Sequence, residues 1–530
     1  MLSYYIVIAV LAAINIVFEL HRDLMMLQQN SYRNLRYRKW LKVSSDTTSV
    51  WRLCAFVIFF MSLSGFGLDI IALPLIGLFA GSHAGVLASK KYKLPLVWTH
   101  RAKRIFSVAL LLVALICALC VLLFGDGDNM KLFRIIAIAL TGCYCGSHVI
   151  IMTANILLSP VEKAINRRYY NDAAARLASM PDLKIIGVTG SYGKTSTKHY
   201  LHRILSEKYD TLMTPGNFNT TLGVVRTIRE NLKPYNEVFV VEMGAKEVGD
   251  IKEICDLVHP QAGIITAVGP QHLESFKTIE NVQSTKFELV DSLPADGFAV
   301  VNNDFDKIAD REVNNVSCLR YAVSAPESAG LTAKDIVYGA GGTDFTAVAT
   351  DGWSLKLHTR LVGECNISNL LAAVAMARYL GVSDEQIRYA VGEIDQVEHR
   401  LNIKRAPGGV IVIDDAYNSN PVGSAMALDV LSGMTSGRRI AVTPGMVELG
   451  ERTYELNHAL GEKIAECADI AVIVCRYNRD AIVEGIRDKG MEADRIYTVD
   501  TFEDAQKLLA GMLKAGDVVL YENDLPDTFK

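Results

Sequence analysis

Residues 184–205 read KIIGVTGSYGKTSTKHYLHRIL, and this stretch decides the fold class. The letters KIIGVT are rich in β-branched and apolar residues, which predicts a buried strand over 184–189. The residues TKHYLHRIL (197–205) are predicted to form the beginning of a helix. A glycine-rich turn between a strand and a helix lets backbone N–H groups surround phosphate oxygens, and the helix N-terminus adds the positive end of its dipole. The stretch therefore predicts a phosphate-binding loop in an α/β protein.

Two residues of this loop have side chains suited to ATP. Lys194 is predicted to reach the β- and γ-phosphates, and the Thr195 hydroxyl to ligate Mg²⁺. The strict form of the motif has glycine where this chain has Val188, and the alternative to phosphate binding is an ordinary turn between a strand and a helix. The predicted ATP-binding loop consists of Thr189, Gly190, Ser191, Tyr192, Gly193, Lys194, Thr195 and Ser196.

On both sides of the loop, short β-branched segments alternate with helical patterns, which is typical of parallel, doubly wound α/β sheets. The break falls near Arg400, ahead of a Pro-Gly-Gly sequence at 407–409. We therefore expect a central ATP-binding domain over 183–398 and a Rossmann-like C-terminal domain over 399–530. Strands are predicted at 184–189, 238–242, 262–267 and 299–302, then at 410–414, 439–443, 470–474, 495–499 and 517–521.

The first 160 residues have a different composition. Half of the chain's residues are apolar and the mean hydropathy is +0.21; the apolar excess lies in the runs 2–18, 53–88, 105–124 and 132–158. About 20 residues cross a bilayer as a helix, so the run 53–88 accommodates two spans, with a turn at Ser64, Gly65 and Gly67. The sequence predicts a five-span α-helical membrane domain over 1–160, followed by a linker over 161–182 with an amphipathic helix through 161–178.

Charge sets the predicted orientation of these spans. The segments 21–52 and 89–104 are basic, whereas 125–131 is acidic. The positive-inside rule therefore places the N-terminus outside and the catalytic domains in the cytoplasm, as expected of a multi-pass protein of the cell membrane. The alternative is a set of buried core helices in a soluble protein. Asp69 is either a functional carboxylate within an apolar stretch or part of the turn between two spans.

Composition also excludes some classes of function. The net charge of −4 gives no basic footprint for nucleic acid. Ten cysteines in 530 residues are too few for a disulfide scaffold, and none has zinc-site spacing. Nothing in the sequence indicates an oligomeric state.

Six further motifs follow the loop in order: TPGNFNTTLG (214–223), VVEMGAKEVGDI (240–251), HLESFKTIENVQSTKFE (272–288), GECNISNLLAA (363–373), DDAYNSNP (414–421) and MVELG (446–450). Together with GVTGSYGKTS they resemble the Mur ligase family, and DDAYNSNP and HLE favour its MurF type. The resemblance covers most of the chain after residue 183. Residues 1–182 have no counterpart in it, and the family's uridine-binding domain is missing.

The resemblance implies a site that agrees with the strand pattern. Glu242 ends a predicted strand and His272 follows another, and side chains at the carboxyl ends of parallel strands share one edge of the sheet. By resemblance both are metal ligands, and Lys286 carries a carbamate that also binds Mg²⁺. Without the resemblance, Glu242 and His272 would be structural, and Lys286 a surface lysine paired with Glu288 or Asp291.

The remaining roles also come from the resemblance. They assign Asn369 to adenine, Arg400 to the γ-phosphate, Asp415 to the ribose, and Asn217, Asn219 and Thr220 to the acceptor. The family resemblance implies an ATP- and Mg²⁺-dependent amide ligase that acts through an acyl phosphate. The simplest substrates are a muramoyl-tripeptide acceptor and D-alanyl-D-alanine as the amine, with membrane lipid as a further partner.

Two departures leave the substrates open. The family's GDMxELG is TPGMVELG here (443–450), and its KGSR is YEND (521–524). The alternatives are a different or lipid-linked carboxylate acceptor, or a non-catalytic membrane scaffold with a retained nucleotide site. A relative that amidates lipid-linked precursors carries a cysteine zinc ribbon, which this chain lacks.

Overall fold

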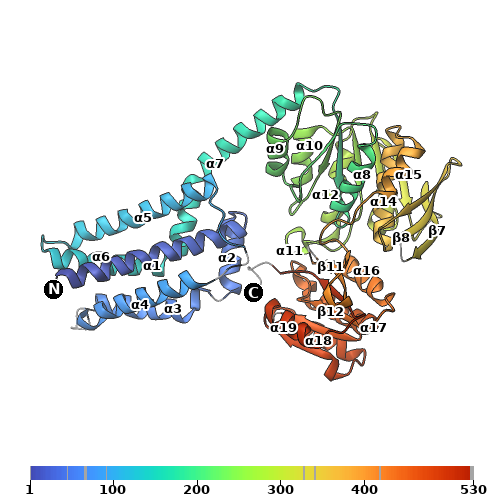
Figure 1. The fold of residues 1–530 in the computed structure, drawn as a ribbon. Coiled ribbons are helices and arrows are strands. Elements are labelled where there is room, and N and C mark those ends of the chain that lie inside the picture. The colour runs from blue at the N-terminus through green and yellow to red at the C-terminus, as the bar shows by residue number, and fades with distance from the viewer. Residues whose placement is uncertain are drawn as a thin grey trace. The chain divides into compact units, whose positions relative to one another are not determined.

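The computed structural model describes all residues except 1, 45, 65–68, 91, 93, 326, 328, 340–341, 417–418, 475 and 526–530. The chain divides into two compact units, a helical one formed mainly by Met1–Asn166 and an α/β one formed by Arg167–Asp524 (Figure 1).

The helical unit is built around α1. The buried positions Ile8, Ala12, Ile16 and Leu20 repeat at helical spacing along α1, which packs against α4, α5 and α6. The outward faces are also apolar: Leu78 is 70% exposed and Leu122 is 80% exposed. A large exposed apolar surface indicates contact with a membrane or another protein. The elements are α1 (Leu2–Gln29), α2 (Asn34–Val43), η1 (Asp46–Thr48), α3 (Val50–Leu63), α4 (Asp69–Ser89), α5 (His100–Phe124), α6 (Asn129–Cys145) and α7 (Ser147–Ala178).

The five predicted spans are not confirmed. Among the described residues, four helices are long and apolar enough to cross a membrane: Leu2–Gln29, Ile70–Ser89, His100–Phe124 and Ser147–Ala178. The 14 residues of α3 reach only about 21 Å, against about 30 Å of hydrocarbon. The run 132–158 is not one helix, because α6 ends before Gly146 and α7 begins after it. Hydropathy follows composition and does not detect such a break.

Two smaller expectations concern the ends of these helices. The proposed turn at Gly65 and Gly67 lies outside the described residues, and α4 begins at Asp69. The linker helix predicted at 161–178 is not a separate element, because it continues α7. The last part of α7 packs on the α/β unit, where Ala173 is fully buried and Asp172 lies 2.6 Å from Arg229.

The larger sheet of the α/β unit has nine strands in the order β2-β3-β1-β4-β5-β6-β7-β8-β9. It is parallel from β2 to β7 and antiparallel from β7 to β9. The predicted strands 184–189 and 238–242 match β1 and β3, whereas the antiparallel extension was not predicted. The strands are β1 (Lys184–Thr189), β2 (Thr211–Met213), β3 (Val238–Glu242), β4 (Ala262–Ile265), β5 (Phe298–Asn302), β6 (Ser317–Ala322), β7 (Leu331–Gly339), β8 (Gly342–Ala349) and β9 (Ser354–Thr359).

Helices cover both faces of this sheet. On one face, Leu201 of α8 and Leu370 of α14 share a core with Val188 and Val240. On the other, Val225 of α9, Ile254 of α10 and Phe287 of α12 pack against the opposite sides of the same strands. The helices are α8 (Lys194–Leu205), α9 (Thr221–Glu230), α10 (Asp250–Val258), α11 (Leu273–Phe276), α12 (Ile279–Asp291), α13 (Asp306–Ala309), α14 (Glu364–Tyr379) and α15 (Asp384–Gly392).

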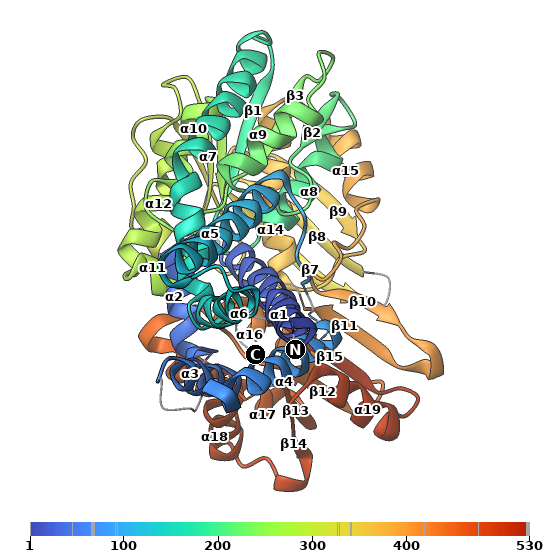
Figure 2. The ribbon, with the colours of Figure 1, turned by 90° about the vertical axis from the view of Figure 1, so that its left-hand side faces the viewer.

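The second sheet has six strands in the order β10-β11-β15-β12-β13-β14 (Figure 2). All pairs are parallel except β10 with β11, so the predicted α/β class is confirmed for both sheets. The elements are β10 (Asn402–Arg405), η3 (Pro407–Gly409), β11 (Ile411–Asp415), α16 (Pro421–Ser432), β12 (Arg439–Thr443), η4 (Gly450–Arg452), α17 (Thr453–Cys467), β13 (Ile470–Val474), α18 (Arg479–Asp488), η5 (Ala493–Arg495), β14 (Ile496–Val499), α19 (Phe502–Met512) and β15 (Val518–Glu522).

Single cysteines at positions 30, 95 and 127 test the membrane topology. If the basic segments face the cytoplasm, a membrane-impermeant thiol reagent should label position 127 in intact cells, and positions 30 and 95 only after permeabilisation. Each cysteine is introduced separately into the parent chain. Labelling of the unmodified parent, which has an exposed Cys54, gives the background to be subtracted. Labelling of position 95 in intact cells would contradict the predicted orientation.

Candidate nucleotide and metal site

The loop between β1 and α8 requires two of its glycines. Gly190 has φ 149°, and a Cβ there would lie 2.1 Å from Thr266 Oγ1. Gly193 has φ 76°, and a Cβ there would lie 2.3 Å from Asn369 Oδ1. Any side chain at either position would collide with its neighbours in a conformation that side chains rarely adopt. The loop therefore passes close to the end of β4 and to α14.

Polar side chains of the loop fix its shape. Thr189 Oγ1 donates to the Met243 carbonyl at 2.9 Å, and Ser191 Oγ donates to the Gly269 carbonyl at 3.1 Å. The carbonyl of Tyr192 accepts a hydrogen bond from Thr266, and Ser196 is buried in the first turn of α8. These side chains hold the loop, which leaves phosphate contacts to the backbone N–H groups and Lys194.

Lys194 begins α8 and folds back over the loop. Its Nζ donates to the carbonyls of Gly190 at 2.5 Å and Ser191 at 3.1 Å. Burial lowers the pKa of Lys194 to about 8, although Glu242 acts to raise it. A phosphate beside this ammonium group would favour its charged form, so the lysine is well placed for an anionic ligand.

Glu242 lies at the end of β3 and is 1% exposed. Its Oε1 accepts from Thr195 Oγ1 at 3.2 Å and from Asn219 Nδ2 at 3.0 Å. Burial acts to raise the pKa of Glu242, but Lys198 and Lys194 outweigh it and hold that pKa below its usual value. An ionised carboxylate beside a hydroxyl offers the oxygen ligands that Mg²⁺ prefers, so Thr195 and Glu242 fit this ion.

Lys198 is a site residue that the sequence analysis missed. Its fully buried Nζ lies 3.0 Å from Glu242 Oε2 and donates to the Gly216 carbonyl at 2.6 Å. Lys198 thus joins the carboxylate to the loop that carries Asn217 and Asn219. The available signal was a second lysine four residues after Lys194, one helical turn along α8.

His272 lies beside the C-terminal half of the unit. Its Nδ1 contacts Glu448 Oε2, and Lys246 Nζ lies 3.4 Å from Glu448 Oε1. Burial lowers the pKa of His272, although the hydrogen bond to Glu448 opposes that shift. Glu448 belongs to the MVELG motif. Its contact with His272 links the two sheets at the edges where ligands are expected to bind.

Lys286 lies on the buried face of α12, with 2% exposure. Burial, reinforced by the charge of Lys194, lowers the pKa of Lys286 well below its usual value. The alternative of a surface lysine paired with Glu288 or Asp291 is wrong. Glu288 instead accepts from the backbone N–H groups of Gly249 and Lys252, and Asp291 pairs with Arg311 at 2.7 Å.

The residues predicted to hold the nucleoside are separated along the unit. Asn369 accepts from Thr197 Oγ1 at 3.1 Å and lies against Gly193, so it supports the loop from below. Asp415, at the end of β11, accepts from the backbone N–H of Leu401 at 3.0 Å. Burial raises the pKa of Asp415, although Arg400 acts to lower it.

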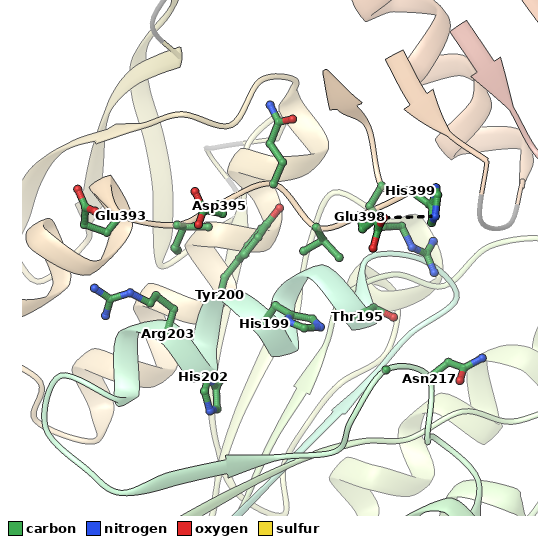
Figure 3. A pocket seen from close by; sticks show the side chains of 15 residues that line it. Thr195, His199, Tyr200, His202, Arg203, Asn217, Glu393, Asp395, Glu398 and His399 are labelled. Atoms are coloured by element: carbon green, nitrogen blue, oxygen red, sulfur yellow. Dashed lines mark ion pairs between the residues drawn. The ribbon is translucent and has the colours of Figure 1, made fainter. Parts of the chain in front are cut away.

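A pocket of about 680 Å³ lies between α8 and the segment 393–400 (Figure 3). Thr195, Asn217 and Arg400 line it, which places three of the predicted residues around one space. Thr220 is not among the lining residues; it caps α9 by accepting from the Gly223 N–H at 3.3 Å. The other lining residues are His199, Tyr200, His202, Arg203, Gly216, Glu393, Ile394, Asp395, Gln396, Val397, Glu398 and His399.

Backbone strain gathers near this site. Non-glycine residues with φ near +50 to +67° include His272, His399, Leu401, Glu448 and Asn523. Such conformations cost about 1–3 kcal/mol each and cluster at ligand sites and switch regions. His399 and Leu401 flank Arg400, where the chain passes from the first sheet to the second. Residues 417 and 418 of the DDAYNSNP motif lie outside the described residues.

The site has a phosphate-binding loop after β1, a buried acid at the end of the neighbouring strand β3, and a second α/β sheet. Together these features define a nucleotide-binding protein of the P-loop class. The Mur ligase middle domain matches residues 188–377, and the Mur ligase glutamate ligase domain matches residues 399–521. Both matches lie within the α/β unit.

Three similar proteins are ligases of the MurF type. The UDP-N-acetylmuramoyl-tripeptide–D-alanyl-D-alanine ligase of Mycobacterium bovis is 30% identical over 369 residues, which cover 64% of this chain and 70% of the relative. Its Bacillus subtilis counterpart is 26% identical over 340 residues, covering 64% and 72%. The structure of MurF ligase from Thermotoga maritima in complex with ADP has a TM-score of 0.59 at 29% identity, and covers 68% of this chain and 80% of that one. The chain belongs to the Mur ligase family, and it is an ATP-dependent ligase of the MurF-like kind.

Replacing Lys198 tests its role at the site. In Lys198→Met the charge that lowers the pKa of Glu242 is lost, so that pKa should rise and the acid limb of the kcat/KM–pH profile should move to higher pH. We expect kcat/KM at neutral pH to fall at least about tenfold, or about 1.4 kcal/mol in transition-state stabilisation. ADP release is the measurement.

Two variants control this experiment. Lys198→Arg keeps the charge and should keep the acid limb near its original position. Lys252→Met removes an exposed lysine on α10 and should behave as the parent. An unchanged pH profile in a folded Lys198→Met protein would show that Lys198 only contributes to packing.

Proposed function

We propose that this chain is a membrane-anchored Mur ligase that uses ATP to join a muramoyl-peptide carboxylate to an amine. The observation that carries the proposal is the grouping of Lys194, Thr195 and Glu242 at the carboxyl ends of β1 and β3, with buried Lys286 on the adjoining helix α12. The MurF-like relatives support the reaction class, and D-alanyl-D-alanine is the simplest amine.

Each group has a role in phosphoryl transfer. The loop N–H groups and Lys194 bind the phosphates, and Arg400 faces the same pocket through the segment that links the two sheets. Mg²⁺ at Thr195 and Glu242 would neutralise charge on the phosphates. Transfer of the γ-phosphoryl group to the acceptor carboxylate gives an acyl phosphate and ADP, and attack by the amine then releases phosphate. Catalysis by these residues is mainly positioning and electrostatic stabilisation.

The buried Lys286 has the properties that a carbamate requires. A neutral primary amine attacks CO₂, forms an N–C bond and releases one proton. Burial and Lys194 favour the neutral amine over the ammonium, and the product is an anion beside Lys194. We propose that modified Lys286 is a third ligand to magnesium, with His272 as a further ligand when it is released from Glu448.

The acceptor is proposed to be at least partly membrane-associated. Neither matched domain extends over residues 1–187, where apolar helices precede the catalytic unit. Basic segments 21–52 and 89–104 would lie at the inner membrane surface, where they suit a polyprenyl-linked pyrophosphate headgroup. The second candidate is the soluble nucleotide-linked tripeptide, which the names of the relatives favour.

Replacing Lys286 by arginine tests the carbamate. The charge is kept, but a guanidinium group cannot form a carbamate, so Lys286→Arg should lose about 100-fold or more in kcat, the scale of one lost electrostatic contact at a reacting centre. Carbon-dioxide-depleted buffer should lower the parent's activity and bicarbonate should restore it, whereas the variant should respond to neither.

The control for Lys286→Arg is Lys252→Arg on the exposed face of α10, which should retain full activity. A folded Lys286→Arg protein with unchanged Tm and full activity would contradict the carbamate. Full activity of the parent in carbon-dioxide-depleted buffer would do so as well.

The acceptor is tested with full-length protein in detergent or lipid nanodiscs. ADP release and product mass should be measured with UDP-linked muramoyl-tripeptide and with its polyprenyl-linked form, each with D-alanyl-D-alanine. We expect a kcat/KM at least about tenfold higher for the lipid-linked acceptor, because its binding site is at the membrane surface. Lys194→Ala should be inactive with both.

Use of the UDP-linked acceptor alone would contradict the membrane-associated acceptor and leave the ligase assignment intact. The absence of ADP release with both acceptors and with every amine tested would contradict the muramoyl-peptide substrate. Full activity of Lys194→Ala would contradict the phosphate-binding role of the loop.

A further inference from the structure

The helical unit buries a charged cluster that the ligase reaction does not use. Arg52 is 1% exposed, and its NH2 lies 2.7 Å from Glu19 Oε1, 3.8 Å from Asp23 Oδ1 and 3.5 Å from Asp46 Oδ2. Arg22 lies 2.7 Å from Glu19 and also pairs with Asp46. The Arg52 cluster is defined here as Glu19, Arg22, Asp23, Asp46, Arg52, Ser147 and His148.

The charges of the Arg52 cluster do not balance. Three carboxylates face two guanidinium groups, which leaves one negative charge when His148 is neutral. Glu19 and Asp23 are fully buried. An uncompensated charge in a low-dielectric interior is destabilising, and ionisable groups inside apolar helical bundles are otherwise paired or functional. The cluster therefore has the electrostatics of a cation site.

Unsatisfied polar atoms point to the same place. Within the described part of the chain, Glu19 Oε2, Asp23 Oδ1 and His148 Nδ1 have no hydrogen-bond partner. Native structures leave few buried polar atoms unpaired, and each one calls for an explanation such as a bound ion. Two of these atoms are acceptors on carboxylates, and the third is an imidazole nitrogen that can bind a metal.

Three side chains of the cluster converge with metal-site spacing. Ligand atoms of Asp23, Asp46 and His148 all lie within 4.8 Å of one another. They come from α1, η1 and the first turn of α7, which are far apart in the sequence. Asp46 already accepts from both arginines, and a carboxylate has about four lone-pair sites, so it has room for an ion as well.

The surroundings of these ligands also suit a bound ion. Ser147 Oγ donates to Asp23 Oδ2 at 2.5 Å, the kind of outer contact that orients a metal-binding carboxylate. The side chains of Asp46 and Arg22 are 10% and 15% exposed, which gives an edge through which an ion can enter.

We propose that Asp23, Asp46 and His148 bind a divalent transition-metal ion within the helical unit. Two carboxylates and an imidazole are ligands for Zn²⁺ and its neighbours rather than for Mg²⁺ or Ca²⁺, which take oxygen ligands. The divalent ion more than offsets the single excess negative charge of the cluster, which changes from one net negative to one net positive charge. It also ties the N-terminal helix and the segment before α3 to the start of α7.

The test uses full-length protein in detergent, stripped with a chelator and supplied with Zn²⁺. We expect one more equivalent of tightly bound zinc in the parent than in His148→Ala or Asp23→Asn, as measured by elemental analysis after desalting. Zinc should raise the Tm of the parent, and the apparent Kd should be weakened at least about tenfold in each variant. The Thr195–Glu242 site is unchanged in all of these proteins and so cancels in the comparison.

Glu162→Gln is the matched control, because Glu162 is a buried carboxylate of the same unit that pairs with Arg104 at 2.6 Å outside the cluster. It should bind zinc as the parent does. If Asp23→Asn does not fold, His148→Gln at the partly exposed histidine replaces it. Equal zinc in the parent and in the folded His148 variants would overturn the proposal. So would a parent that binds no zinc but gains stability as pH falls, because a proton would then balance the charge.

Discussion

The α/β unit depends on one buried carboxylate. Glu242 ends β3 beside the phosphate-binding loop, and its two oxygens contact Thr195, Asn219 and Lys198. Removing one partner of a buried ion pair costs about 3–5 kcal/mol, so Glu242 and Lys198 have to be present together. The arrangement links the first turn of α8 to the loop after β2. Two lysines on one side of a single acid also leave a positive site for phosphates.

Much of this edge could be predicted because it follows from strand order. Parallel strands bring their carboxyl ends to one edge, so Lys194, Thr195 and Glu242 could be placed together from sequence. Lys198 could not, because a lysine on a helix is ordinarily solvated, and only the tertiary structure shows that α8 buries it. His272 could be placed at the same edge, but not its contact with Glu448, which depends on how the two sheets pack. The antiparallel strands β7–β9 lacked the short buried pattern used to recognise the others.

The helical unit shows the limits of composition in another way. Hydropathy located its apolar stretches, but it did not detect the break at Gly146 or that α7 continues through the predicted linker. It also gave no sign of the Arg52 cluster, whose members lie mainly in the segment 21–52, which was interpreted as a basic loop, and within the apolar run 132–158. Glu19, Arg52 and Ser147 are separated by many residues in the sequence and meet only when the helices pack. A charge count along the chain therefore predicts an orientation, whereas the proposed metal site depends on charges that meet only in the folded structure.

On the C-terminal side of the site, two motifs of this chain differ from the family's pattern. Its YEND segment places Glu522 at the end of β15, 2% exposed, accepting from Ser419 at 2.6 Å and Ser424 at 2.8 Å. Burial, together with the neighbouring Asp415, raises the pKa of Glu522 well above its usual value. Two adjacent acids cannot both ionise cheaply in a buried site, so the charge of Asp415 disfavours the ionised form of Glu522. The family's KGSR pattern would supply positive charge to bind a carboxylate, whereas the pair of Asp415 and Glu522 supplies none. The ATP side thus keeps the family's residues, whereas the residues on the opposite side differ from the family's pattern, so the amine is the open part of the proposed function.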